Sequence, residues 1–375
     1  MYIISGSALD RANEIAKARN FKVDVYVDAK GELAKHFEVT YTPQLLLFDA
    51  AKKLTGSYDD LDSVPKGESG ALPRFKPVGD SGTELGTAYD VVVMAADEAQ
   101  AKEDLKAARD VLHECERHLS EWKDDSDITE LNRSAYIKPF EAKGDLLKII
   151  KASLQVSKAT EGAFDITWLP LGKLWDDAAK ANKLPTQEEI DAVRKAVGSD
   201  KIKLSGSMVS FTHENTKIGL GGVAKGWIVD AVFLDLKKRG YENLVVRIGG
   251  DMRTGGSGPE GKWNFRIVDP WDQSRFVGTF DLEDAAVSTS GQYYRFVEIE
   301  GKRYGHIIDP RTGWPATFEG SVSVITHDSA MADALSKALF IMGPDEGIKW
   351  VKNHPGIEVI YATREGLKST LDVKR

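Results

Sequence analysis

The sequence is poor in cysteine and in long apolar runs. Its 375 residues include a single cysteine, Cys115, which excludes an internal disulfide framework, a zinc ribbon and a CxxC redox pair within this chain. No run approaches the roughly 18 consecutive apolar residues that a membrane-spanning helix needs. Residues 1–6 lack the charged and apolar regions of a signal peptide, so we do not expect one in this chain.

Basic residues are also in the minority. Fifty Lys and Arg stand against 58 Asp and Glu, which gives a formal net charge of -8. This balance argues against a nucleic-acid-binding protein, because such proteins normally present a basic face. Hydrophobic residues at 42% and charged residues at 29% are typical of a globular protein with large cores. The length predicts about two to three domains.

The first part of the chain, residues 1–58, has α/β patterning. Strands are predicted at residues 2–5, 23–27, 44–48 and 54–58, with helices at 8–19 and 32–37. This segment resembles the later part of a thioredoxin- or peroxiredoxin-like domain, and Pro43 stands where that fold keeps a cis-proline. The part of that fold with the redox cysteines is absent. The segment is therefore either truncated or a redox-inactive remnant, and a small structural module is favoured over thiol chemistry.

Residues 59–74 are rich in Asp, Ser, Gly, Pro and Lys, and we interpret them as an interdomain linker. A second domain is expected over residues 75–375. It begins with a strand at 88–94 and a long helix at 98–122, whose apolar stripe is Leu105, Ala108, Leu112, Cys115 and Leu119. Cys115 is therefore expected to be a buried core thiol. Further helices are predicted at 145–160, 186–197, 224–239 and 330–342, with strands over 243–325 and a hairpin at 298–302.

A glycine-rich loop precedes one of these helices. Residues 219–226, GLGGVAKG, contain four glycines in eight positions. Such a loop lets backbone N–H groups approach a phosphate at a helix N-terminus, where Lys225 adds a positive charge. The spacing also matches the Rossmann pattern, but no parallel continuation follows it. A tight turn that closes onto a helix is the alternative interpretation.

Four further motifs accompany the loop. They are GAFDITWLPL at 162–171, IGGD at 248–251, STSG at 288–291 and HIIDPRTG at 306–313. Additional signals are ELGT at 84–87, Ser120, Trp122, Ser126, Asn132 and ADAL at 332–335. In order and spacing these residues resemble the ApbE family, the FAD:protein FMN transferases. The resemblance extends from about residue 75 to the C-terminus and implies an α+β flavin transferase domain.

The family resemblance implies a reaction and its residues. Members transfer FMN from FAD to a threonine of a flavoprotein subunit, release AMP and use Mg2+, whereas some members hydrolyse FAD. The implied flavin contacts are Leu85, Trp122, Ala163, Phe164, Asp165, Lys225 and Ile307. The implied Mg2+ ligands are the Gly222 carbonyl and Asp333, and Ser336 is a candidate third oxygen donor. His306 is the candidate base and Asp333 the candidate catalytic carboxylate; a structural strand histidine is the alternative for His306.

Two positions depart from the family pattern. Gly219 stands where the family usually has an aspartate that helps to bind FAD. Lys337 stands where the family usually has a threonine that ligates the metal, and an ammonium cannot ligate a cation. Because Lys337 is four residues after Asp333, both face the same side of a helix and can pair.

Three functions therefore remain open: a flavin transferase, a weakened flavin-binding protein with Lys337 in the metal position, and a Mg2+-dependent FAD diphosphatase. The resemblance implies an acceptor flavoprotein subunit as the partner and an extracytoplasmic location, in the periplasm or cell envelope.

Overall fold

The structure is a computed structural model that describes residues 75–375, except Glu260, Tyr293, Tyr294 and Arg375, together with four short strands nearer the N-terminus. The chain divides into two compact units, residues 1–76 and 77–375. Each unit is described by itself.

The first unit contains the four strands that the sequence predicts. Strand β1 (Tyr2–Ser5) pairs in parallel with β2 (Val25–Asp28), and β3 (Leu45–Phe48) pairs antiparallel with β4 (Leu54–Tyr58). The helices expected at 8–19 and 32–37, Pro43 and the linker at 59–74 lie outside the described residues. The thioredoxin-like origin of this segment stays a prediction.

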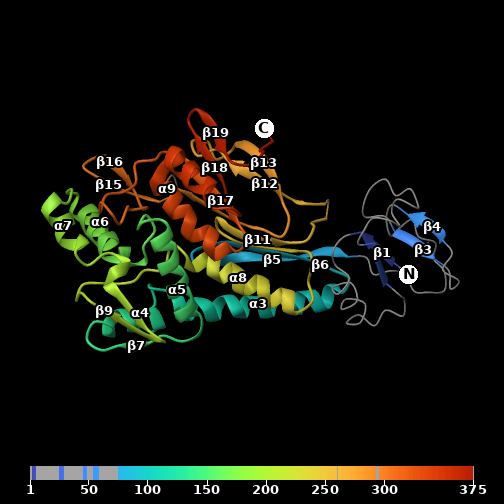
Figure 1. Cartoon of the computed structure of the whole chain (residues 1–375), viewed down its shortest axis with the longest axis horizontal. Coiled ribbons are helices and arrows are strands. Elements are labelled where there is room, and N and C mark those ends of the chain that lie inside the picture. The colour runs from blue at the N-terminus through green and yellow to red at the C-terminus, as the bar shows by residue number, and fades with distance from the viewer. Residues whose placement is uncertain are drawn as a thin grey trace. The chain divides into compact units, whose positions relative to one another are not determined.

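The second unit is built on an eight-stranded sheet (Figure 1). Its strands, in spatial order, are β19 (Gly366–Ser369), β18 (Glu358–Thr363), β17 (Ser321–Thr326), β14 (Ala286–Gly291), β11 (Asp251–Gly255), β10 (Leu244–Ile248), β6 (Thr87–Ala95) and β5 (Lys76–Glu84). All neighbours from β6 to β19 are antiparallel. An antiparallel sheet excludes the doubly wound Rossmann arrangement, which needs parallel strands.

The two faces of the sheet bury different cores, as the alternation of side chains in a strand requires. In β18, Val359 and Tyr361 join the main core with helices α3 (Glu98–Leu119), α8 (Ala224–Lys238) and α9 (Ser329–Lys352). Ile360 and Ala362 join a smaller core with the hairpin β12 (Trp263–Val268) and β13 (Phe276–Leu282). Helices thus cover one face, and the hairpin covers the other (Figure 1).

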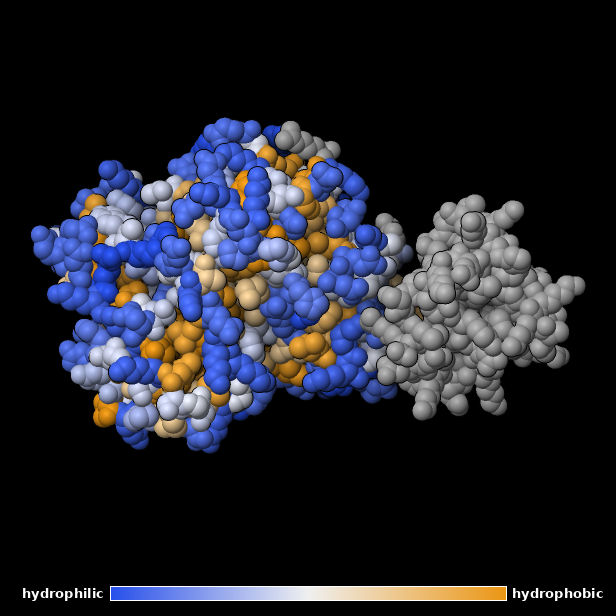
Figure 2. Space-filling view, in the orientation of Figure 1, coloured by the Kyte–Doolittle hydropathy of each residue, from blue (hydrophilic) through white to orange (hydrophobic). Residues whose placement is uncertain are grey.

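The remaining elements extend the unit beyond the sheet. They are α4 (Asp127–Ser134), α5 (Gly144–Ala159), α6 (Leu169–Ala181) and α7 (Gln187–Arg194), the strands β7 (Phe140–Glu141), β8 (Ile202–Ser205) and β9 (Met208–Phe211), and the hairpin β15 (Phe296–Ile299) and β16 (Lys302–Gly305). A third core joins α6, α7 and the hairpin around Trp175. Figure 2 shows this unit mostly hydrophilic on one face, with apolar residues gathered toward the middle of that face.

Most predicted elements are confirmed, and the differences have local causes. The helix expected at 98–122 ends at Leu119. The helix expected at 330–342 continues to Lys352 beyond a kink, where Gly343 has φ 74° and Pro344 follows. Helices α4 and α6 were not predicted. Pro170 in the first turn of α6 is compatible with a helix, because N–H groups there have no helical acceptor.

Candidate active site

The glycine-rich loop is held in place by two side chains from other elements. The indole Nε1 of Trp168 donates a hydrogen bond to the carbonyl of Gly219 (3.0 Å), and a carboxylate oxygen of Glu121 accepts one from the N–H of Gly221 (3.0 Å). A Cβ atom at position 219 would lie 2.9 Å from that indole nitrogen. The indole therefore occupies the space that the aspartate usual in the family would need.

Glu121 has an unusual environment for an acid. Burial raises the pKa of its carboxyl, and hydrogen bonds from the loop N–H groups of Gly221 and Leu220 oppose that rise. The next residue, Trp122, is 77% exposed. The residue that precedes the predicted flavin contact Trp122 is thus hydrogen-bonded to the glycine loop.

Helix α8 begins at Ala224, within the glycine-rich segment, and crosses α9 closely at Gly226. The N–H of Gly226 donates to Oδ2 of Asp333 on α9 (3.0 Å). The helix has no side-chain cap of its own, so Asp333 satisfies one of its free N–H groups. A Cβ atom on residue 226 would lie 2.2 Å from the carbonyl oxygen of Ser329. Only glycine permits this approach.

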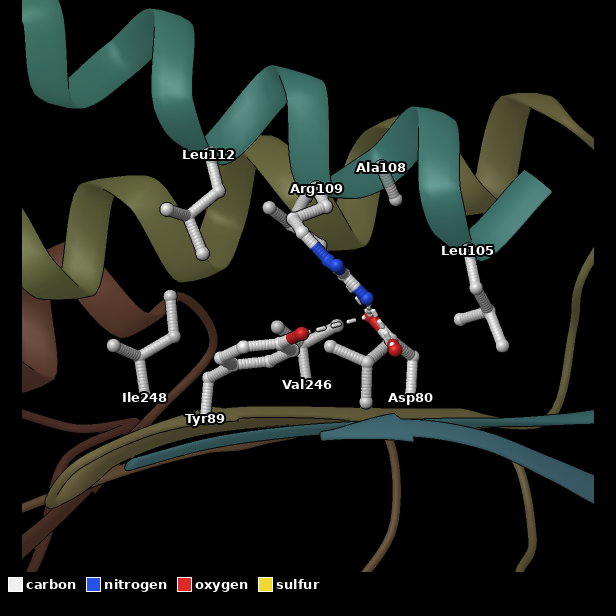
Figure 3. Close-up of a pocket in the computed structure, with 10 residues that line it drawn as sticks. Asp80, Tyr89, Leu105, Ala108, Arg109, Leu112, Val246 and Ile248 are labelled. Atoms are coloured by element: carbon white, nitrogen blue, oxygen red, sulfur yellow. Dashed lines mark hydrogen bonds and ion pairs between the residues drawn. The ribbon is translucent and has the colours of Figure 1, made fainter. Parts of the chain in front are cut away.

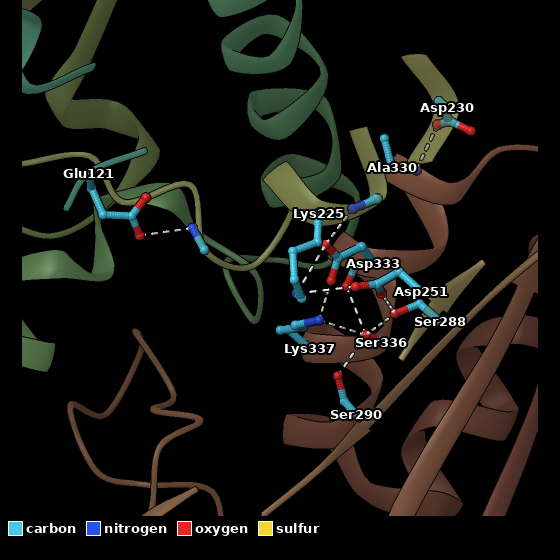
Figure 4. A network of polar contacts seen from close by, with 12 residues as sticks. Glu121, Lys225, Asp230, Asp251, Ser288, Ser290, Ala330, Asp333, Ser336 and Lys337 are labelled. Carbon is cyan, nitrogen blue, oxygen red and sulfur yellow. Dashed lines mark hydrogen bonds and ion pairs between the residues drawn. The ribbon is translucent and has the colours of Figure 1, made fainter. Parts of the chain in front are cut away.

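Two lysines and two aspartates form the centre of the site (Figure 4). Lys225 Nζ lies 3.1 Å from Oδ2 of Asp251 and 3.8 Å from Oδ2 of Asp333. Lys337 donates to Oδ1 of Asp333, one helical turn away. The side chain of Asp333 is 0% exposed and that of Asp251 is 2% exposed, whereas the two lysines keep solvent contact. We call these four residues the lysine–aspartate cluster.

The charges in the cluster stabilise one another. Burial alone would raise the pKa of Asp333, but the charges of Lys225 and Lys337, with the hydrogen bonds from Lys337 and Gly226, lower it. Burial alone would lower the pKa of Lys225, but the charges of Asp251 and Asp333 raise it. Asp333 is therefore ionised and both lysines have carboxylate partners.

Three serines connect the cluster to the sheet. Ser288 donates to Oδ1 of Asp251, its partner across the β11–β14 ladder. The hydroxyl of Ser336 donates to the carbonyl of Asp333 (2.8 Å) and lies 2.7 Å from the Ser290 hydroxyl and 3.3 Å from that of Ser288. Lys337 Nζ lies 3.2 Å from the same Ser336 oxygen. The hydroxyl of Ser336 is thus fully engaged within the protein.

His306 lies within electrostatic reach of the two lysines. Its Nδ1 is 2.9 Å from the carbonyl of Arg295. Loss of water around part of the ring lowers the pKa of His306 to about 4, and the positive charges of Lys337, Arg295 and Lys225 act in the same direction. Because a carbonyl only accepts, Nδ1 has the proton and Nε2 has the free lone pair. The ring is therefore a neutral base at neutral pH.

The other predicted flavin contacts differ in their surroundings. Phe164 borders the loop, since a Cβ on Gly222 would lie 3.3 Å from its ring. Ala163 and Ile307 are buried. Asp165 is also buried, and it accepts hydrogen bonds from Ser157 and from the backbone and hydroxyl of Thr167. Its carboxylate therefore caps the N-terminus of a 3-10 helix, residues Ile166–Trp168.

Leu85 lies at the two-residue turn between β5 and β6. Leu85 and Gly86 have φ values of 55° and 67°, as in the turn that best matches the twist of a hairpin. The turn is followed by Thr87, which lies next to Gly249, just before Asp251. Leu85 is thus linked to the cluster through the neighbouring strand end. The roles of all these residues toward a flavin stay predictions.

Several residues of the site were absent from the predicted set. Asp251 belongs to the IGGD motif and Ser288 and Ser290 to the STSG motif, and the cross-strand register of β11 and β14 explains why Asp251 meets Ser288. Trp168 also belongs to such a motif, but its hydrogen bond to Gly219 spans 51 residues. Glu121 has no sequence signal, because only the fold brings it to the loop.

A small cavity in the described part of the chain lies away from these residues. It has about 10 Å³ of space and lies between α3 and the sheet (Figure 3). There Arg109 pairs with Asp80, which also accepts a hydrogen bond from Tyr89 (3.0 Å). The cavity is too small for a flavin and contains none of the predicted site residues. Within the described part of the chain, no helix is long and apolar enough to cross a membrane.

Comparison with known proteins places this geometry in a family. The ApbE family model matches residues 85–361. The chain belongs to the ApbE family. The FAD:protein FMN transferase of Vibrio cholerae is 32% identical over 295 residues, which cover 77% of this chain and 88% of that protein. The FAD:protein FMN transferase of Haemophilus influenzae is 30% identical over 303 residues, or 76% and 87% of the two chains.

Solved structures from the ApbE family have the same fold. The flavin transferase ApbE from Vibrio cholerae matches with a TM-score of 0.68 at 29% identity, over 80% of this chain and 97% of that one. The ApbE protein from Thermotoga maritima matches with a TM-score of 0.71 at 28% identity, over 78% of this chain and 96% of that one. The predicted resemblance and α+β fold class are confirmed.

Proposed function

We propose that this chain is an FAD:protein FMN transferase, which moves FMN from FAD to a threonine of a flavoprotein subunit and releases AMP. Membership of the ApbE family supports the reaction type. The structural observation that carries the proposal is the meeting of the glycine loop and the lysine–aspartate cluster at the N-terminus of α8, with His306 within electrostatic reach of both lysines.

Each of these parts suits one need of the reaction. Lys225 and the N-terminus of α8 attract the diphosphate of FAD, because both present positive charge. His306 accepts the proton of the threonine hydroxyl at Nε2. The threonine oxygen forms a bond to the phosphorus of the FMN moiety, the bond to the bridging oxygen of the diphosphate breaks, and AMP leaves with the electron pair.

The magnesium ion that the family resemblance implies does not fit this arrangement. Asp333 accepts from Gly226 and pairs with Lys225 and Lys337, and Ser336 is occupied by hydrogen bonds. Among the described residues, no group of three histidine, cysteine or acidic side chains could hold a metal ion. No step of the proposed mechanism therefore passes through a metal.

We propose that the acceptor is a flavoprotein subunit with an exposed target threonine. We also propose that the protein acts in the periplasm or cell envelope. Both rest on the family resemblance. Fractionating cells that express the full-length gene product would test the location, and recovery of the protein in the cytoplasm would contradict it.

The decisive experiment combines the purified chain, FAD and an acceptor subunit. Intact mass spectrometry should detect one FMN moiety on the acceptor, with one AMP released for each, and neither on an acceptor whose target threonine is replaced by alanine. Release of AMP without labelling of the acceptor would instead indicate an FAD diphosphatase. Binding of FAD without release of AMP would indicate a flavin-binding protein.

A further inference from the structure

The side chain of Lys337 contacts both groups that the family resemblance implies as metal ligands, the glycine loop at Gly222 and the carboxylate of Asp333. It donates to Oδ1 of Asp333. The stem of the same side chain borders the glycine loop, because a Cβ atom on Gly222 would lie 3.7 Å from Lys337 Cγ. The lysine thus extends from the loop to the carboxylate. We propose that Lys337 replaces the divalent cation at Asp333, so that this chain acts on FAD without a metal at this site.

The first argument is the coordination of Asp333. Its Oδ2 accepts from the N–H of Gly226 (3.0 Å) and faces Lys225 (3.8 Å), and its Oδ1 accepts from Lys337. A cation at this carboxylate would have to displace an ammonium, because the hydrogen bond from Gly226 is part of the contact between α8 and α9. Both oxygens of Asp333 already accept a hydrogen bond, so a further cation would have to share the carboxylate with two ammonium groups.

The second argument is the charge of the cluster. The two buried carboxylates, Asp251 and Asp333, are balanced by the two ammonium groups of Lys225 and Lys337. A divalent cation would add two positive charges beside two ammonium groups, in a site where both carboxylates are almost fully buried. With a threonine at position 337 the cluster would have a net negative charge, and a cation would be favoured.

The third argument is how firmly Lys337 is held. Its ammonium also lies 3.2 Å from the hydroxyl of Ser336, and its side chain is only 20% exposed. Lys225 also keeps part of its exposure, 32%, so neither lysine side chain of the cluster is fully enclosed by the protein. Lys225 and Lys337 would then bind the diphosphate of FAD as a pair of fixed cations, a task otherwise shared with a metal.

This inference rests on the proposed function for its substrate, but its test does not need turnover. Binding of Mn2+, a spectroscopic substitute for Mg2+, is followed by the loss of its free electron paramagnetic resonance signal. The wild-type chain should leave Mn2+ free, and Lys337→Thr should bind one Mn2+ per chain, with an affinity increased by about tenfold or more. The double variant Lys337→Thr/Asp333→Asn should lose that site. The matched control, Lys349→Thr, changes a lysine elsewhere on α9 and should behave like the wild type.

A second measurement follows AMP release from FAD with and without EDTA. EDTA should not change the rate of AMP release by the wild type, because the cation at Asp333 is then the ammonium of Lys337, which a chelator cannot remove. FAD itself chelates Mn2+. Each Mn2+ titration in the presence of FAD is therefore repeated with the Asp333→Asn variant, which shows how much Mn2+ is bound by FAD alone. A wild-type site for one Mn2+ that Asp333→Asn removes would overturn the inference, with or without FAD. The inference would also be overturned if a folded Lys337→Thr variant did not bind Mn2+. An inactive wild type that excludes Mn2+ would refute the transferase function alone.

Discussion

Asp333 and Asp230 cap each other's helices. Asp333 on α9 accepts a hydrogen bond from the first turn of α8. Asp230 on α8 accepts two hydrogen bonds from the first turn of α9, donated by the N–H groups of Ser329 and Ala330 (both 2.9 Å). The positive ends of both helices therefore face a carboxylate from the other helix. This exchange fixes the position of α9 relative to α8, and with it the position of the lysine–aspartate cluster.

Replacing Asp230 tests how much this exchange stabilises the fold. Asp230→Ala removes two helix-capping bonds and leaves Arg253, which is 2.7 Å from Asp230, without its buried partner. We expect a loss of about 3 kcal/mol in the free energy of unfolding in urea. Asp235→Ala on the same helix removes a more exposed pair with Arg239 and should cost less than about 1 kcal/mol. Equal losses in the two variants would contradict the capping role.

The close crossing of α8 and α9 predicts a glycine requirement at position 226. Alanine is the better helix former by about 1 kcal/mol, yet Gly226→Ala should destabilise the protein by about 2 kcal/mol, because its Cβ would overlap Ser329 and Asp333. Gly79→Ala is the control, since its Cβ would meet only ordinary contacts at 3.5 Å. Urea denaturation measures both. A stabilised Gly226→Ala variant would show that the helices can separate without cost.

Lys225 is expected to bind the diphosphate of FAD. Lys225→Met keeps the length of the side chain and removes its charge, so the dissociation constant for FAD should rise by about tenfold or more. Flavin fluorescence titration measures this constant, at a temperature where circular dichroism shows the variant folded. Lys238→Met, at the exposed end of the same helix, should bind FAD as the wild type does. Unchanged affinity in Lys225→Met would place the diphosphate elsewhere.

The lowered pKa of His306 predicts an unusual pH dependence. Since the neutral ring is the base, the rate of FMN transfer should stay high as the pH falls through 6.5 and should decline only near pH 4. Between those values the unfolded chain binds a proton at this histidine that the folded chain does not, so stability should also fall as the pH decreases. His306→Gln keeps a donor for Arg295 but cannot accept a proton. It should lose transfer and retain FAD binding. An acidic limb centred at pH 6.5 would contradict the assignment.

Much of the fold could be predicted because local patterns determine it. The apolar stripe of residues 105–119 gives α3 its buried face, and Cys115 is buried there as expected. The hairpin at β15 and β16 follows from its turn at Glu300 and Gly301, both with positive φ. Such features depend on neighbours within a few residues, and the order of the glycine, aspartate and serine motifs was enough to indicate the family.

What the sequence by itself determined was the family, the fold class and the pairing of Lys337 with Asp333, since a four-residue spacing on a helix places two side chains on one face. Only the tertiary structure decided that Lys225 also faces Asp333 and Asp251, that Asp333 caps α8, and that Asp165 is committed to Thr167 and Ser157. The contacts of Asp333 with α8 and of Asp251 with Lys225 join separate elements, so they depend on how helices pack on a sheet. Packing is decided by burial and shape over the whole core, for which no local spacing is a guide.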